Sequence, residues 1–211
     1  MRLTNNEIIF LTSVSRGRVP MGVTYHLPRQ EEKEPFIKET ISSLKTKGIL
    51  DEKENLTKEG AVLIYSWEQY RNCRVHIRLN HVNAAVLPGN VLFTVIKAEE
   101  GYEAACLRSE VLMTEILKQS AYLCQAEEKP HRGRWQDIGG KEFKERLEES
   151  DDGIYLAEYL SGGLVSEKVY FWKGDQGYLF NKSQGRIREL SPGIMRKQIY
   201  KALKGRQEDG R

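Results

Sequence analysis

Apolar positions in the first third of the chain recur at helical spacing in three segments. "TNNE" at the start can form a capping box, in which the Thr4 hydroxyl accepts from the Glu7 amide and the Glu7 side chain reaches back. A second helix is predicted to begin near Pro35 and to stop at Gly48. A short strand and a turn follow, and then a third helix that a threonine caps. This order predicts a winged-helix-like segment over residues 4–72.

Beyond Cys73 the pattern changes from helical spacing to alternation. Val75, Ile77 and Leu79 alternate with polar neighbours, which predicts a half-buried strand. Further strands are predicted in "NAAVLPGNVLFTVIKAEEGYEAACL", "GIYLAEYL", "EKVYFWKGD" and "GYLFNKS", and "LSGGL" is predicted to be a hairpin turn. Helices are predicted over residues 109–123, 141–150 and 191–203.

A short motif occurs twice. "KAEEGY" at residues 97–102 is matched by "KGDQGY" at residues 173–178, with Lys, Gly and Tyr at the same spacing and an apolar strand before each copy. Each half of the chain thus offers strands, this turn, another strand and a closing helix. We interpret the match as a weak internal duplication, although acidic turns with glycine occur in any antiparallel sheet.

The predicted fold class is α/β in the α+β sense, with two pseudo-symmetric antiparallel sheet-plus-helix lobes. The polar stretch at residues 125–140 is the best boundary, so the lobes are residues 1–125, which include the winged-helix-like segment, and residues 126–211. A single composite domain is the alternative, because 211 residues suffice for either arrangement.

Composition and net charge are those of an ordinary globular protein. The chain is 39% hydrophobic and 30% charged, as in ordinary globular proteins, and its net charge of +3 does not require a polyanionic partner. Basic residues gather at the C-terminal end, where we interpret them as the solvated end of a helix: Arg186, Arg188, Arg196, Lys197, Lys201, Lys204, Arg206 and Arg211.

Cysteine usage and the N-terminus predict a cytoplasmic protein. The three cysteines, Cys73, Cys106 and Cys124, are far apart and form no C-x-x-C pair, so reduced thiols are expected. The N-terminus lacks the architecture of a signal peptide, and no apolar run approaches the roughly 18 residues of a membrane span.

Motifs for catalysis or cofactor binding are not found. The histidines, His26, His76, His81 and His131, match no metal-binding pattern, and neither a phosphate-binding loop nor a G-x-S-x-G motif occurs. Paired acids such as Glu99–Glu100 are expected in exposed turns, where they add solubility. We therefore predict a protein that is not an enzyme and has no cofactor, no metal and no catalytic residues.

The winged-helix-like segment makes DNA binding an alternative. Glu31, Glu32 and Glu34 lie on the approach to the second helix, where they would face phosphates and weaken binding. The turn "LDEKENL" that would serve as a wing is also net acidic. Nucleic acid is thus an unfavoured partner, and a winged-helix transcriptional regulator is the second hypothesis.

Protein binding is the remaining class. Aromatic side chains in strands belong mainly to the core, but at sheet edges they also anchor protein partners. The residues that we predict to contact a partner are the two turns and nearby aromatics: Lys97, Glu99, Glu100, Tyr102, Trp135, Trp172, Lys173, Asp175 and Tyr178.

The order of these elements resembles that of a known family. "LTNNEIIFL", then "IKETISSLKTKGILDEKENLTKEG", then a repeated sheet region with closing helices, is similar to the EspG family of type VII secretion chaperones, and above all to its distant relatives in Gram-positive bacteria. The resemblance implies a cytosolic, non-enzymatic protein of quasi-two-fold α/β architecture. It also implies a partner, a secreted helical-hairpin substrate that the chaperone keeps soluble and competent for export.

Overall fold

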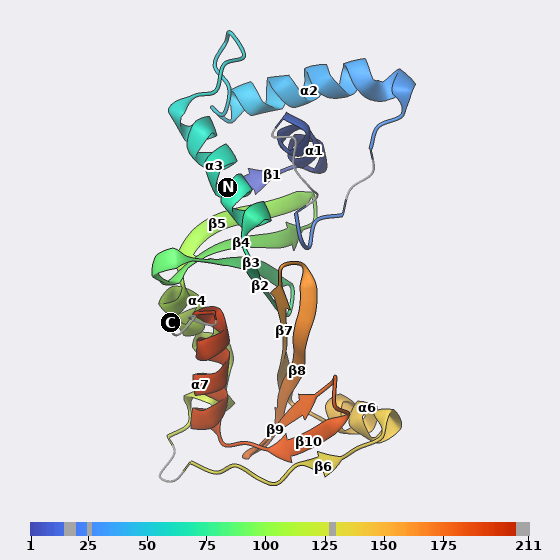
Figure 1. Ribbon diagram of the computed structural model, residues 1–211, viewed down its shortest axis with the longest axis vertical. Coiled ribbons are helices and arrows are strands. Elements are labelled where there is room, and N and C mark those ends of the chain that lie inside the picture. Colours follow the sequence, from blue (N-terminus) through green and yellow to red (C-terminus); the bar gives the residue numbers. More distant parts are fainter. Residues whose placement is uncertain (15–19, 25–26, 127–129, 206–211) are drawn as a thin grey trace. The chain divides into compact units, whose positions relative to one another are not determined.

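The computed structural model describes residues 1–14, 20–24, 27–126 and 130–205. Within these ranges the helices are α1 (Asn5–Val14), α2 (Lys33–Thr46), α3 (Lys58–Asn72), α4 (Ser109–Gln119), α5 (Ala121–Cys124), α6 (Gly140–Glu148) and α7 (Pro192–Leu203) (Figure 1). The strands are β1 (Arg2–Leu3), β2 (Val75–Leu79), β3 (Val82–Leu87), β4 (Val91–Ala98), β5 (Gly101–Arg108), β6 (Gln136–Asp137), β7 (Asp152–Leu160), β8 (Gly163–Lys173), β9 (Gln176–Asn181) and β10 (Arg186–Glu189).

The predicted helices and the main strands are confirmed. Sequence patterns missed the short strands β1, β6 and β10, and they merged α4 and α5, which are separated at Ser120. There the Ser120 side chain accepts a hydrogen bond from the Leu123 amide and caps α5. No helix in the part of the chain that the structure describes is long and apolar enough to span a bilayer.

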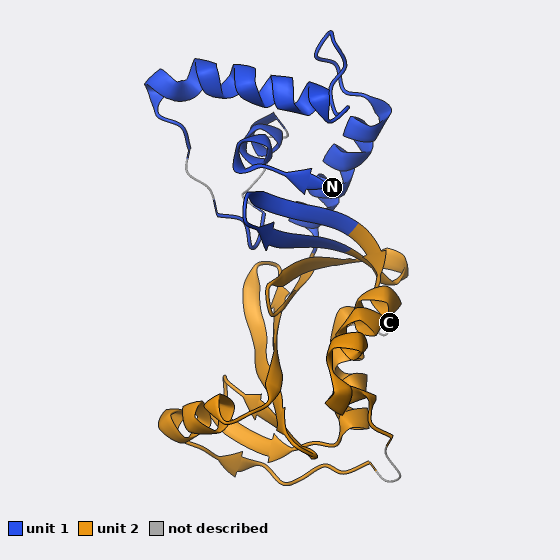
Figure 2. Ribbon diagram, turned by 180° about the vertical axis from the view of Figure 1, so that it is seen from behind, with its two compact units in different colours: residues 1–73, 93–105 blue, residues 74–92, 106–211 orange. Residues whose placement is uncertain are grey.

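The chain divides into two compact units (Figure 2). Unit 1 comprises residues 1–73 and 93–105, and unit 2 comprises residues 74–92 and 106–211, so that the boundary falls within β4 and β5. The lobes 1–125 and 126–211 were predicted from the polar stretch and the internal repeat in the sequence, whereas the two units are defined by contacts within the structure. The division into these lobes stays a prediction.

In unit 1 the predicted capping box is present, and its Glu7 carboxylate also binds residues at the end of α2. The Thr4 hydroxyl accepts from the Glu7 amide (3.2 Å), and the Glu7 carboxylate accepts from the Thr4 amide (2.7 Å). This carboxylate is fully buried, and it also accepts from the Ser43 hydroxyl (2.8 Å) and from Lys47 Nζ (2.6 Å) on α2 and just beyond it. A buried charge requires such partners, so the cap of α1 is joined to the end of α2.

Aromatic rings form the centre of unit 1. The Trp67 and Tyr70 rings on α3 are stacked with centroids 6.0 Å apart, and the Phe93 ring of β4 lies 5.5 Å from that of Tyr70. The Tyr70 hydroxyl donates to the Met21 carbonyl (2.7 Å), so the ring cluster also fixes the segment before α2. Trp67 and Tyr70 are almost completely buried, which identifies this cluster as the core of the unit.

The order of elements predicted for residues 4–72, two helices, a short strand with a turn, and a third helix, is present. Thr57 caps α3 by accepting from the Gly60 amide (3.0 Å), and Leu50 forms an isolated bridge with Leu56. Residues 47–57, which separate α2 from α3, thus contain the short strand and turn that were predicted there.

In unit 2 an antiparallel sheet is covered by helices on both faces. Its strand order is β3-β2-β7-β8-β9-β10-β6. One face packs against α4, α5 and α7 through a large buried cluster that includes Ile77, Leu156, Tyr170, Met195 and Ile199. The other face packs against α6, where the Phe143 and Phe180 rings are stacked with centroids 3.9 Å apart.

The chain order contains an internal repeat, but the repeated turn motif does not mark it. Four strands and a closing helix occur twice, as β2 to β5 with α4 and as β7 to β10 with α7. "KAEEGY" joins the third and fourth strands of the first set, whereas "KGDQGY" joins the second and third strands of the other. The repeat of sheet and helix is confirmed, and the equivalence of the two turns is wrong.

Candidate functional site

The turn between β4 and β5 presents three of the predicted partner residues. Lys97, Glu99 and Glu100 are exposed. Gly101 has a φ of 98°, and a Cβ at this position would lie 2.2 Å from the Leu3 carbonyl oxygen. The turn therefore needs glycine for two reasons, its positive φ and the close approach of β1.

Tyr102 lies beside this turn but inside unit 1. Its side chain is almost completely buried, opposite Leu3 in the pairing of β5 with β1. The Tyr102 hydroxyl accepts from the Thr24 amide (2.8 Å) and donates to the Thr24 carbonyl (3.2 Å). The ring belongs to the core, and we leave it out of the partner surface that we propose.

The turn between β8 and β9 presents charges that neighbouring groups already engage. Lys173 Nζ lies 3.0 Å from the Glu149 carboxylate, and Asp175 accepts from Gln125 Nε2 at 3.3 Å. The Gly174 amide donates to the Asp151 carboxylate (2.7 Å). All of these contacts are solvent-exposed, so they hold the turn in place without adding much stability.

The predicted aromatic residues differ in exposure. Trp172 is buried and stacks on Tyr122, with ring centroids 5.4 Å apart. Tyr178 is half-buried and stacks on Phe171 at the same centroid separation of 5.4 Å. Trp172 thus belongs to the core, while Tyr178 remains partly accessible.

Trp135 lies under a cation. The Arg188 guanidinium carbon is 4.3 Å from the centre of the Trp135 ring, close enough for a cation–π interaction. Burial, together with the nearby charge of Arg132, lowers the pKa of the Arg188 guanidinium. Trp135 is half-buried, so one side of the pair remains accessible.

The end of the β7–β8 hairpin is an exposed apolar feature that sequence patterns missed. Ser161 and Gly162 both have positive φ, 50° and 83°, as a tight hairpin turn requires, which confirms the turn predicted for "LSGGL". Leu164 and Val165, just after the turn, are 52% and 46% exposed. The signal in the sequence was the break in alternation, two apolar residues in succession after a glycine pair.

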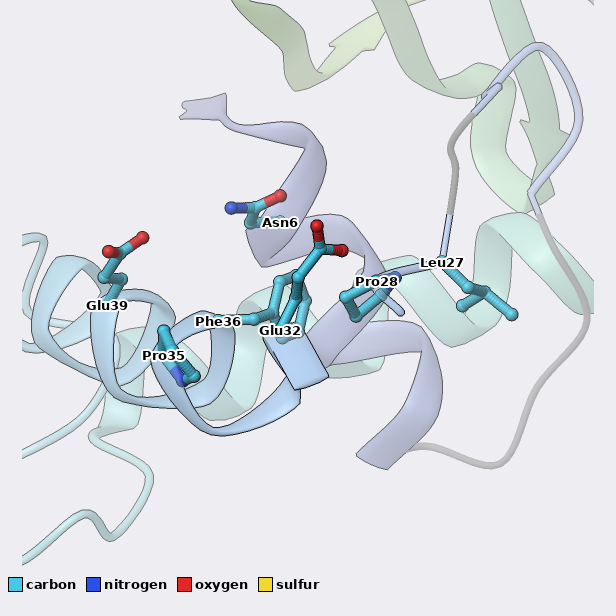
Figure 3. A pocket seen from close by; sticks show the side chains of 7 residues that line it. All are labelled: Asn6, Leu27, Pro28, Glu32, Pro35, Phe36 and Glu39. Carbon is cyan, nitrogen blue, oxygen red and sulfur yellow. The ribbon is translucent and has the colours of Figure 1, made fainter. Parts of the chain in front are cut away.

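Two hollows in unit 1 were also missed. The first, which we name the acidic pocket, has a volume of about 370 Å³ (Figure 3) and is lined by Asn6, Leu27, Pro28, Glu32, Pro35, Phe36 and Glu39. The second, the apolar groove, has a volume of about 210 Å³ and is lined by Phe10, Leu11, Val14, Ile41, Leu44, Leu50, Glu54, Leu56 and Ile64. Helical spacing in the sequence does not distinguish a position in a core from one that lines a hollow.

Titratable groups in unit 2 form ion pairs. The Tyr155 hydroxyl donates to the Glu167 carboxylate (2.8 Å), which Lys182 Nζ also contacts (2.7 Å). Burial and this hydrogen bond raise the pKa of Tyr155 to about 12. Among the described residues no group of three or more His, Cys, Asp and Glu side chains could hold a metal ion.

A comparison with solved structures identifies the fold. The chain is similar in its α+β fold to the Mycobacterium tuberculosis type VII secretion system chaperone EspG5, whose structure was solved in complex with the PE25–PPE41 dimer. The TM-score is 0.58, and the match covers 96% of this chain and 95% of EspG5 at 7% sequence identity. At this identity the likeness establishes the fold, and it confirms the EspG-like architecture indicated by the sequence.

The sequence itself belongs to a family without an assigned function. A family model described as a domain of unknown function, DUF5081, matches residues 2–208, so the chain is a member of the DUF5081 family. A search of proteins with curated functions found no match.

Proposed function

We propose that this protein is a cytosolic, non-enzymatic chaperone or adaptor that binds a helical-hairpin substrate of a type VII secretion system. The observation that carries the proposal is the likeness of the fold to EspG5 over nearly the whole of both chains. EspG5 was solved in complex with the PE25–PPE41 dimer, which is the kind of partner that we propose for this chain.

Exposed apolar features support this role. A secreted helical hairpin that waits for export has an apolar surface, which a chaperone covers to prevent aggregation. Leu164 and Val165 at the end of the β7–β8 hairpin offer such a contact. The charged turn residues Lys97, Glu99, Glu100, Lys173 and Asp175, together with Trp135 and Tyr178, remain separate proposed contacts for a partner, each within its own unit.

A DNA-binding regulator is the less favoured hypothesis. The exposed start of α2 and the 3-10 turn before it carry Glu31, Glu32 and Glu34, which repel phosphate. The turn at residues 50–56 that would serve as a wing is net acidic as well.

The test is co-expression with a small helical-hairpin protein encoded beside the gene for this chain. We expect a stoichiometric complex that survives size-exclusion chromatography. Leu164→Ser with Val165→Ser should weaken it at least tenfold, because both side chains leave water on binding. Val62→Ser on α3 is the matched control, since Val62 is also exposed (59%) but lies in unit 1.

Two results would contradict the proposal. One is the absence of a complex with every such neighbour. The other is tight binding of random duplex DNA at low salt that weakens steeply as salt is added, measured by fluorescence anisotropy, which would favour the regulator.

A further inference from the structure

The acidic pocket has a defined geometry. Glu32, Phe36 and Glu39 follow one another at intervals of four and three residues, so they share one face of the 3-10 turn and α2 (Figure 3). Leu27 and Pro28 line the pocket from the segment before this turn, and α1 contributes Asn6. The lining is thus apolar in the middle, with a carboxylate on either side of Phe36.

The pocket has a negative charge that its own lining does not neutralise. Two of its lining residues are carboxylates and none is cationic. One oxygen of Glu32 accepts from the Arg29 amide (2.8 Å), which fixes the side chain and leaves the second oxygen for a ligand. Within the described residues the Glu39 carboxylate has no hydrogen bond or ion pair. Glu39 also lies beyond the first turn of α2, where the helix dipole no longer favours an acid.

The apolar part of the lining is accessible as well. Leu27 is 71% exposed, and Phe36 and Pro28 are half-buried. An occupant therefore needs an apolar stem and a cationic end. Arginine has both, and its planar guanidinium can stack on an aromatic ring while it donates to carboxylates. A volume of about 370 Å³ is small for a ligand pocket and suits one long side chain with its neighbour.

We propose that the acidic pocket docks an arginine side chain of a partner protein, presented next to an aliphatic residue. The arginine stem lies on Phe36 and Pro35, and the guanidinium donates to Glu32 and Glu39. The aliphatic neighbour of the arginine covers Leu27. This docking point requires a protein partner, and it does not depend on the role in secretion proposed above.

The test uses the full chain, labelled with ¹⁵N, and the peptide acetyl-Ala-Leu-Arg-Leu-Ala-amide. We expect shifts of the amide signals of Asn6, Leu27, Phe36 and Glu39, and binding that weakens as salt is added. A peptide with norleucine in place of arginine should bind at least fivefold more weakly.

Variants separate the pocket from a general effect of charge. Glu32→Gln with Glu39→Gln should weaken binding of the arginine peptide by about fivefold or more. Glu31→Gln with Glu34→Gln removes the same charge from exposed residues outside the lining and should leave binding unchanged. Glu39→Gln alone, which affects no helix cap, should still weaken it.

Three results would overturn the proposal. They are the absence of shifts at millimolar peptide, shifts that map to another surface, and equal losses in the two double variants. The amide spectrum of each variant shows directly whether it is folded.

Discussion

The turns at residues 97–102 and 173–178 contain Lys, Gly and Tyr at the same spacing, and the structure uses these residues differently. In the first turn Gly101 has positive φ and touches β1, and the buried Tyr102 binds the segment before α2. In the second turn Gly174 has positive φ instead, and Gly177 lies within β9, where a Cβ would be 2.1 Å from the Tyr122 hydroxyl.

The bend falls at a different place in the two motifs. β4 ends one residue after Lys97, whereas β8 ends at Lys173 itself. The surroundings of the two tyrosines differ as well: Tyr102 is buried opposite Leu3 of β1, whereas Tyr178 is half-buried and stacks on Phe171. Matching letters establish a common turn chemistry and not a common position in the fold.

The largest effect is expected from a comparison of the glycine that has positive φ in each of the two turns. Gly101→Ala should destabilise the protein by about 3 kcal/mol or more, because the new Cβ meets the backbone of Leu3 and Thr4, which cannot move aside. Gly174→Ala, at a φ of 55° with open space around it, should cost only about 1 kcal/mol of turn strain. Urea unfolding measures both, and equal losses would show that β1 does not pack on the turn.

Gly177→Ala should lower the free energy of unfolding by about 2 kcal/mol for a different reason, since Gly177 does not have a positive φ. The new methyl group displaces the Tyr122 ring, which stacks on Trp172 and donates to the Leu190 carbonyl (3.0 Å). In a Tyr122→Phe background the cost should fall, because the atom nearest the methyl group is gone. Independent, additive losses in this double-mutant cycle would contradict the contact.

The two tyrosines give the next comparison. Tyr102→Phe should lower the free energy of unfolding by about 1–2 kcal/mol, because it removes the partner of both backbone groups of Thr24. Tyr178→Phe, whose hydroxyl donates to Gln176 at the surface, should change it by less than about 0.5 kcal/mol. Thermal melts of the two variants measure both losses. A larger loss for Tyr178→Phe than for Tyr102→Phe would contradict the burial of the Tyr102 hydroxyl.

The smallest effect is expected at the tip of the first turn. Glu99→Lys with Glu100→Lys should change the melting temperature by less than about 2 °C, because exposed turn charges contribute little to stability. The same variant tests the proposed partner contact at this turn: it should bind the helical-hairpin partner more weakly while remaining folded. Unfolding of the variant would instead make these residues structural.

Local patterns predicted the elements well because local chemistry determines them. The capping box at Thr4, the cap at Thr57 and the start of α7 at Ser191 all follow from residues within one turn of a helix. The short strands β1 and β6 were missed because long-range pairing alone defines them, Arg2 with Glu103 and Ile187 with Gln136.

The candidate surfaces were harder to predict than the elements. Tyr102 and Trp172 look like Tyr178 and Trp135 in the sequence, but their exposure depends on which strands and helices pack beside them. The acidic pocket brings Asn6 of α1 together with residues from 27–39, which lie well beyond the end of that helix in the sequence. No periodicity in the sequence records that approach.

Unit 1 is formed by two separate stretches of the chain, which affects how it folds during synthesis and how a fragment of it can be made. Residues 1–73 contain α1, α2 and α3, but Phe93 and Tyr102, which complete the core of the unit, come from residues 93–105. On the ribosome, the helices emerge first and wait for two strands that are made later, with Trp67 and Tyr70 uncovered in the interval. A fragment that stops at residue 73 keeps this apolar surface permanently, so a shortened unit 1 must join residues 93–105 to it in order to stay in solution.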